Sequence, residues 1–274
     1  MQSGIYSGTV INQNAAQNFF AQHENYCIAL TQKWHTAPQD VYFIAGQNIS
    51  GSLSASEGGL ILHHFTEFSA ETEALLQDFF VTRKVFCTSG SQLGALFLQK
   101  LFLQSKGMKP AEERPMHLMQ THDAPQARIP PDGLSIRQCS LADFDRLLPL
   151  QKGFYIEEVL PANHPFNMLS CRLNLHNDLE KKTLFAIADK SGKLLAKISE
   201  TAESEHCTLI GGVYTLPEFR RRGLSRALCS WLVNKNAQKG KSCVLFVKED
   251  NTPAIATYMQ SGFKIISSYE IDYW

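Results

Sequence analysis

The chain has 274 residues, of which 44% are hydrophobic and 19% charged, with 26 basic and 26 acidic side chains. This length suits two compact domains, and the composition is typical of a globular protein with an ample core. The formal net charge of zero gives no electrostatic footprint for nucleic acid or for an anionic membrane. No apolar run approaches the roughly 20 residues that span a bilayer, and the first residues, MQSGIYSGTV, lack the pattern of a secretory signal.

Seven cysteines are scattered along the chain without a C-x-x-C pair, at positions 27, 87, 139, 171, 207, 229 and 243. Disulfide frameworks and zinc sites need spacings that are absent here. We therefore expect reduced thiols, no metal and a cytoplasmic location.

The first half of the chain has alternating patterns of helix and strand. We expect helices at 15–34, 70–80 and 91–104, and strands at 41–45, 59–64, 85–88 and 115–120. A linker at 125–133 follows, because Pro125, Pro130, Pro131 and Gly133 lie among polar residues there. The expected domains are therefore 1–124 and 134–274.

The second half gives stronger patterns. Ser140 and Asp143 predict the start of a helix at 141–160, which Pro149 and Gly153 should kink or split. Further helices are expected at 166–179, 223–238 and 251–260, and strands at 134–138, 183–188, 194–200, 206–215, 242–247, 263–267 and 269–273. This order, βααβββαβαββ, predicts an α/β domain with helices on both faces of a mixed sheet. The first half repeats it more faintly, so we expect two copies of one architecture.

The most informative stretch is a basic loop where the strand at 206–215 leads into the helix at 223–238. It reads Arg220-Arg-Arg-Gly-Leu-Ser225. A helix start offers free backbone N–H groups and the positive end of the helix dipole, which together bind phosphate, and Gly223 allows close approach of an anion. The alternative is a solvated basic turn before an ordinary helix.

This loop resembles the pyrophosphate loop of the GNAT superfamily of acyl-CoA N-acyltransferases, which reads Arg/Gln-x-x-Gly-x-Gly/Ala. Serine replaces glycine or alanine at the last position. The resemblance implies a GNAT-like fold, and a loop that binds the phosphates of acetyl-CoA through Arg220, Arg221, Arg222, Gly223, Leu224 and Ser225. It also implies that the preceding strand end pairs with the pantetheine arm through Val213, Tyr214 and Thr215.

A second segment is also similar to this family. Residues 251–263, NTPAIATYMQSGF, resemble the family's Asn-x-x-Ala-x-x-x-Tyr-x-x-x-Gly-Phe pattern. Ala254 and Tyr258 are four residues apart and share one helix face. The resemblance implies that Asn251 lies near the pantetheine and that the Tyr258 hydroxyl lies beside the CoA sulfur. The alternatives are a simple N-cap for Asn251 and a half-buried helix aromatic for Tyr258.

The resemblance implies a transferase that moves an acetyl group to a primary amine by direct attack, with Tyr258 as the general acid. The base stays open. The family often has a carboxylate in the strand before the loop, where this chain has Leu209 and Ile210. We take Glu200 and Glu205 as candidates, with Glu203 and His206 nearby. Glu157 and Glu158 would suit a cationic amine in the acceptor pocket, or simply form a solvated helix end.

The first half lacks a phosphate loop, and we expect it to wall the acceptor pocket or to support the second half. Its His63 and His64 are adjacent, so on a strand they point to opposite faces and make a poor metal pair. The alternative to an enzyme is a non-catalytic acyl-CoA-binding or regulatory module. The acceptor amine and the oligomeric state are left open by the sequence.

Overall fold

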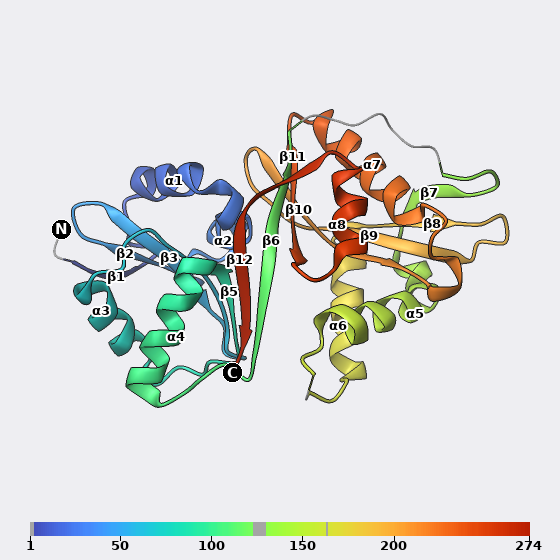
Figure 1. Cartoon of the computed structure of the whole chain (residues 1–274). Coiled ribbons are helices and arrows are strands. Elements are labelled where there is room, and N and C mark those ends of the chain that lie inside the picture. Colours follow the sequence, from blue (N-terminus) through green and yellow to red (C-terminus); the bar gives the residue numbers. More distant parts are fainter. Residues whose placement is uncertain (1–2, 123–129, 163) are drawn as a thin grey trace. The chain divides into compact units, whose positions relative to one another are not determined.

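The computed structural model describes residues 3–122, 130–162 and 164–274 (Figure 1). The part of the predicted linker at 125–129 lies outside the described residues. The contacts of the chain divide it into two compact units. Unit 1 comprises Met1–Leu118 and Ile266–Trp274, and unit 2 comprises Met119–Ile265.

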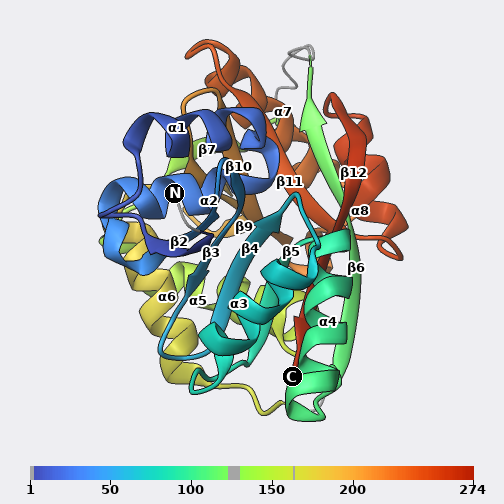
Figure 2. The ribbon, with the colours of Figure 1, turned by 90° about the vertical axis from the view of Figure 1, so that its left-hand side faces the viewer.

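Unit 1 is a mixed sheet with two pairs of helices. Its elements are β1 (Gly4–Ser7), α1 (Gln13–Gln22), α2 (Glu24–Thr36), β2 (Val41–Ala45), β3 (Ile49–Ala55), β4 (Leu60–Phe65), α3 (Ala70–Phe80), β5 (Cys87–Ser91), α4 (Gln92–Lys106) and most of β6 (Glu112–Thr121). The strands β1 to β4 pair antiparallel in succession, and β4 pairs parallel with β5. Figure 2 shows β2 to β5 side by side.

The two faces of this sheet bury different helices. Along β2, Phe43 packs in a core with α1 and α2, whereas its neighbour Ile44 packs in a core with α3 and α4. This alternation is the period-2 pattern of a strand that is covered on both faces.

Unit 2 repeats the arrangement. Its elements are β7 (Ser135–Gln138), α5 (Phe144–Phe154), α6 (Met168–Glu180), β8 (Leu184–Ala188), β9 (Leu194–Glu203), β10 (Cys207–Thr215), α7 (Leu224–Ala237), β11 (Ser242–Lys248), α8 (Thr252–Met259) and the start of β12 (Phe263–Tyr273). The strands β7 to β10 pair antiparallel in succession, and β10 pairs parallel with β11. Along β8, Leu184 and Ala186 face the core of α5 and α6, and Phe185 and Ile187 face the core of α7. Figure 1 shows α7 and α5 with α6 beside this sheet.

The prediction of two copies of one architecture is confirmed, because each unit runs through strand, two helices, three strands, helix, strand, helix and strand. The last strand, β12, does not respect the expected domain boundaries, because it is divided between the two units. Residues 269–273 of β12 pair antiparallel with β5 from Ser91 to Cys87, so they belong to unit 1 and not with the rest of 134–274. In exchange, Thr121 at the end of β6 belongs to unit 2, where its Oγ1 accepts from the Cys243 amide at 2.9 Å.

Several predicted elements have other bounds. The helix expected at 15–34 is two helices that meet at His23, whose φ of −120° is not helical. The helix at 141–160 opens with the predicted capping box of Ser140 and Asp143 as a 3₁₀ turn, runs unbroken through Pro149, and becomes a π-helix at Tyr155–Val159. The two expected final strands are one continuous strand, β12.

Two further features concern the whole described chain. All seven cysteines lie among the described residues as free, buried thiols. Within the described ranges, no helix combines the length and apolarity that a bilayer crossing would need.

Candidate functional site

The site is built where β10 and β11 part. These parallel strands are paired only from Cys207 to Leu209, opposite Ser242 to Val244, although β10 continues to Thr215 and β11 continues to Lys248. Beyond the paired segment, the inner edges of both strands carry backbone groups that do not bond to each other. The sheet therefore opens toward the carboxyl ends of β10 and β11, which is where ligands commonly bind in α/β folds.

A bulge in β10 lies beside this opening. The register against β9 shifts between Gly211 and Tyr214, so Gly212 and Val213 have no paired residue on that strand. Gly212 has a φ of +61°, in the left-handed region that favours glycine. The Nζ of Lys197, on β9, donates to the Gly212 carbonyl at 2.9 Å.

The loop before α7 presents free backbone donors. Gly223 is the N-cap residue of α7 with a φ of +75°, and Arg221 has a φ of +63°. Among the described residues, none accepts a hydrogen bond from the backbone amides of 221–225. A Cβ built on Gly223 would meet nothing within 4 Å, so the space beside this residue is open. Such a turn at a helix start is suited to an anion.

The three arginines of the loop do different things. Arg220 donates through Nη2 to Glu157 at 2.7 Å and through Nε to the Thr215 carbonyl at 3.1 Å. Arg220 therefore stabilises the position of the loop against the end of β10. Arg221 and Arg222 are exposed, and Arg222 lies over the ring of Phe219. These two supply the positive potential at the surface of the loop.

Serine at the last position of the loop motif has a partner. The Ser225 hydroxyl lies 2.8 Å from the hydroxyl of Thr215, the final residue of β10. The contact ties the first turn of α7 to the strand that carries the bulge. The departure from glycine or alanine therefore adds a hydrogen bond while keeping a small side chain.

The two glutamates of the π-helix are bonded to residues of the site. Glu157 accepts from the Tyr214 hydroxyl at 2.5 Å and from Arg220 at 2.7 Å, and Glu158 accepts from Asn251 at 3.3 Å. Lys248 also pairs with Glu158 at 3.3 Å. The sequence predicted that this pair would receive a cationic amine. That role stays a prediction, and an amine would have to compete with Arg220 for Glu157 and with Lys248 for Glu158.

The Tyr214 side chain lies in a tight position. A Cβ on Gly153 of α5 would lie 2.3 Å from the Tyr214 hydroxyl, so only glycine allows this approach. Burial, followed by the hydrogen bond to Glu157, raises the pKa of Tyr214 to about 12. Burial opposes ionisation of Glu157, but the bonds from Tyr214 and Arg220 together lower its pKa. The pair is thus a phenol donating to a carboxylate at neutral pH.

The second predicted motif lies on α8. Asn251 caps this helix, since its Oδ1 accepts from the Ala254 amide at 3.2 Å, and its Nδ2 bonds to Glu158. Ala254 and Tyr258 pack against the core beneath α7. Burial raises the pKa of Tyr258 far above its usual range, and the nearby Cys229 and Glu158 add to the shift. The Tyr258 hydroxyl therefore stays protonated at any physiological pH.

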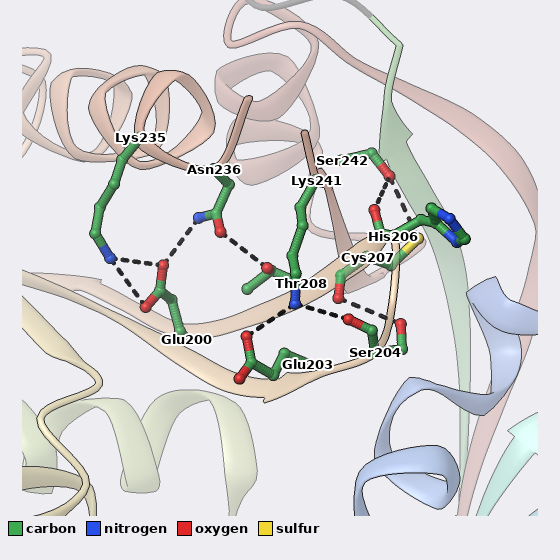
Figure 3. Close-up of polar contacts among 10 residues, drawn as sticks. All are labelled: Glu200, Glu203, Ser204, His206, Cys207, Thr208, Lys235, Asn236, Lys241 and Ser242. Atoms are coloured by element: carbon green, nitrogen blue, oxygen red, sulfur yellow. Dashed lines mark hydrogen bonds and ion pairs between the residues drawn. The ribbon is translucent and has the colours of Figure 1, made fainter. Parts of the chain in front are cut away.

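Of the two predicted bases, Glu200 lies opposite Ile210, next to the bulge, but its carboxylate is bonded to α7. Glu200 is held by Lys235 at 2.9 and 3.1 Å and by Asn236 at 2.9 Å, in the last turn of α7 (Figure 3). The phosphate loop is at the opposite end of that helix, about 18 Å away at 1.5 Å per residue. Glu205 is exposed before β10, about 23 Å from Gly212 at 3.3 Å per residue of extended chain. The base role of these two residues stays a prediction, and for Glu200 it would require release from Lys235 and Asn236.

The neighbours of the two predicted bases lie in the same region. Glu203 pairs with Lys241 at 3.0 Å, and the carbonyl of His206 accepts from Ser242 (Figure 3). Thr208 donates to Asn236 at 2.9 Å and so joins the network around Glu200. These contacts make the cluster a brace between α7 and the start of β10.

Sequence reasoning missed Lys197. Its side chain is 1% exposed and reaches the bulge on the face covered by α5 and α6. The available signal was a lone lysine in the otherwise apolar segment Leu194–Ile198, since a lysine is almost never fully buried without a partner.

The corresponding region of unit 1 is built differently. The helix after β4, α3, is capped by Ser69, whose side chain accepts from the Thr72 amide, and Glu71 and Glu73 lie in its first turn. A side-chain acceptor and two negative charges lie where unit 2 has its phosphate loop, so this helix start is unsuited to an anion. The expectation that unit 1 does not hold phosphates in the manner of unit 2 is consistent with this arrangement.

The adjacent histidines of β4 face opposite sides of the sheet, as predicted. The His63 ring packs against Gly90 and Gly94, and the His64 ring stacks on Tyr26 of α2 with centroids 4.7 Å apart. In the parts of the chain that the structure describes, no three potential metal ligands form a group suited to an ion.

Comparison with known proteins agrees with this geometry. The family model described as FR47-like protein matches residues 189–274, which contain the bulge, the loop and α8. A GCN5-related N-acetyltransferase from Sphaerobacter thermophilus has a similar structure, with a TM-score of 0.63 at 14% identity over 98% of this chain and 94% of that one. A tandem GNAT protein from the clavulanic acid biosynthesis pathway gives 0.59 at 11% identity, over 99% of this chain and 97% of that one.

A curated relative matches only part of the chain. The UPF0157 protein YqkA of Bacillus subtilis is 35% identical over 80 residues, which are 29% of this chain and 23% of the relative. This chain thus spans about a quarter of that protein's length. The FR47-like match and the shared fold support the predicted resemblance to the GNAT superfamily, and the predicted GNAT-like fold in two copies is confirmed.

Proposed function

We propose that unit 2 is an N-acetyltransferase that moves the acetyl group of acetyl-CoA to a primary amine. One observation carries the proposal: the opening between β10 and β11 leads to a loop whose amides at 221–225 have no acceptor among the described residues. Parted strands accommodate an extended arm, and free amides at a helix start bind a diphosphate.

The residues fit an acyl-CoA ligand. The amides of 221–225 would hold the diphosphate, with Arg221 and Arg222 beside it, and the open space at Gly223 would admit it. The edge of β10 at Val213, Tyr214 and Thr215 would pair with the pantetheine arm. The ligand supplies the activated acyl group as a thioester.

The remaining chemistry belongs to side chains and backbone. The amine nitrogen would bond to the thioester carbonyl carbon, the C–S bond would break, the nitrogen would lose a proton and the sulfur would gain one. The Val213 amide would stabilise the negative charge on the carbonyl oxygen. Tyr258, which stays protonated, would donate to the departing sulfur. Cys207 and Cys229 are buried and play no part as nucleophiles.

The test is release of free thiol from acetyl-CoA in the presence of an amine panel of polyamines, amino acids, aminoglycosides and peptides. We expect release that depends on one class of amine and that yields the acetylated product by mass spectrometry. CoA binding without thiol release on any amine would contradict the enzyme.

A non-catalytic acyl-CoA-binding module is the second candidate. One observation favours it: Glu157, Glu158 and Glu200 are all paired with other side chains of unit 2, so none of them is an unpaired base at the bulge. In that case, calorimetry would give a CoA affinity and the amine panel would give no product.

A further inference from the structure

A lysine is buried beneath the bulge of β10. The Lys197 side chain is 1% exposed, its Nζ donates to the Gly212 carbonyl at 2.9 Å, and it lies 4.6 Å from the centroid of the Phe154 ring. Burying an amine is costly unless it is paired. The carbonyl and the ring are the partners that stabilise its charge.

Glycine makes room for this ammonium group. A Cβ on Gly212 would lie 3.0 Å from the Lys197 Nζ and 3.4 Å from the Ser199 hydroxyl. Ser199 is buried, and its hydroxyl has no hydrogen-bond partner in the described part of the chain. The underside of the bulge is therefore polar and closed by Lys197.

The bonded carbonyl belongs to the same peptide unit as the Val213 amide. No peptide bond among the described residues is cis, so the N–H of Val213 points away from the Gly212 oxygen and from Lys197. A cation that binds one end of a peptide unit draws electron density toward that end and strengthens the donor at the other end. The Val213 N–H is thus a stronger donor than an ordinary backbone amide.

We infer that Lys197 is a positioning residue of the transfer reaction: it fixes and polarises the Gly212–Val213 peptide, so that the Val213 amide binds the negative charge that develops on the thioester oxygen. This inference rests on the proposed function of unit 2. Lys197 acts through the peptide and does not contact the reacting atoms.

The charge on Lys197 is held by several groups. Burial lowers its pKa to about 8, while Asp178 and Cys171 of α6 and Cys139 after β7 act in the opposite direction. Phe154 of α5 faces it with its ring. At pH 7 the group is therefore mainly an ammonium, and above about pH 8 it becomes a neutral amine that donates a weaker hydrogen bond.

One experiment follows the Val213 amide directly by NMR in uniformly ¹⁵N-labelled full-length protein between pH 6 and 10. We expect its amide resonance to move with a midpoint near pH 8, and this movement to be absent in Lys197→Met. The methionine keeps an unbranched apolar stem of similar length. A Val213 resonance that does not titrate in the wild-type protein would overturn the inference even if the variant failed to fold.

The second experiment is kinetic, on wild type and Lys197→Met with acetyl-CoA and the best amine. We expect kcat to fall about 10- to 100-fold while the dissociation constant for CoA changes less than about threefold. The wild-type rate should decline above pH 8, and the variant should lose that decline. Lys197→Arg, which keeps a charged donor, should recover part of kcat.

The outcomes separate the two proposals. An active wild-type enzyme with equal kcat and an equal pH profile in Lys197→Met would overturn only the role of Lys197. A wild-type protein that releases no thiol on any amine would overturn the proposed function and this role with it.

Discussion

The hydroxyls of Thr215 and Ser225 lie 2.8 Å apart and connect the end of β10 to the first turn of α7. Thr215 also accepts from Arg220 through its carbonyl. Thr215, at the end of β10, thus bonds to both the first and the last residue of the loop, Arg220 and Ser225. The free amides of 221–225 therefore belong to a loop that is already held in place. Binding an anion there would cost little additional conformational entropy of the loop.

The first prediction concerns Ser225. Ser225→Ala loses the hydroxyl contact but keeps the small size, so we expect CoA affinity to stay within about threefold and the free energy of unfolding to fall by about 1 kcal/mol. Ser225→Leu places bulk beside the free amides, and we expect at least a 30-fold loss of affinity. Isothermal titration calorimetry and urea denaturation measure both. Equal affinities in the two variants would show that this turn does not contact the ligand.

The second prediction compares two glycines at opposite ends of α7. Gly223 and Gly240 have φ of +75° and +74°, and a Cβ on either meets nothing within 4 Å. A glutamate at either position therefore costs similar backbone strain, about 1–2 kcal/mol. We expect Gly223→Glu to abolish CoA binding, because its charge and bulk enter the anion site, and Gly240→Glu to bind normally. Loss of binding in both variants would indicate a folding defect.

Much of the fold was predictable because its patterns are local. Helix α3 at Ala70–Phe80 and strand β2 at Val41–Ala45 have the predicted bounds, since both combine strong periodicity with clear ends. Strand β3 was missed because its sequence, ISGSLSA, is rich in serine and glycine, and its strand conformation depends on pairing with β2 and β4. Tertiary context overrides weak local propensity there.

The candidate site shows the same division. Loop residues 220–225 and Asn251 could be predicted as site residues because glycines, arginines and helix caps follow recognisable local sequence patterns. The pairing of Glu157 with Tyr214 was not, since the two residues are 57 positions apart and meet only when α5 packs on β10. The division of β6 and β12 between the units was equally hidden, because strand partners are set by residues far apart in the chain, such as Tyr269 and Ser91.

The third prediction tests Tyr258. Tyr258→Phe removes one hydroxyl and keeps the ring that packs on Phe263 with centroids 5.9 Å apart. If the hydroxyl protonates the leaving sulfur, kcat should fall about 10²-fold or more, while CoA affinity changes little. Tyr269→Phe is the matched control, because Tyr269 is a buried tyrosine of unit 1 bonded to Ser89. Undiminished turnover in Tyr258→Phe would remove its role as acid.

The fourth prediction tests the carboxylate that holds Arg220. Glu157→Gln removes a negative charge 2.7 Å from this arginine, so the potential at the loop becomes more positive. We expect CoA to bind about two- to fivefold more tightly at low salt, with the gain shrinking as salt screens it. Glu218→Gln, which removes an exposed charge paired with Lys193, should have a smaller effect. Weaker binding in Glu157→Gln would mean that the carboxylate mainly orients the loop.

The last prediction concerns acid stability at the start of α5. Asp143 is bonded by both terminal nitrogens of Arg137, at 2.8 and 2.6 Å, and caps its helix through the Ser140 amide. The hydrogen bonds from Arg137 are the main reason that its pKa falls from 3.8 to about 2. A carboxyl whose pKa is lower in the folded than in the unfolded protein stabilises the fold at any pH above the unfolded-state pKa. This contribution disappears as the pH falls from about 4 to 2. Asp143→Asn should therefore lower the free energy of unfolding by about 1–2 kcal/mol at pH 7 and match the wild type near pH 2. The effect is modest because the arginine partner is partly exposed.

The control is Asp145→Asn, at an exposed acid of the same turn, which should change the free energy of unfolding by less than about 0.5 kcal/mol at either pH. Thermal denaturation followed by circular dichroism at pH 2, 3, 4 and 7 measures these differences, and a Asp143→Asn deficit that persists unchanged at pH 2 would show that the ion pair is not its source.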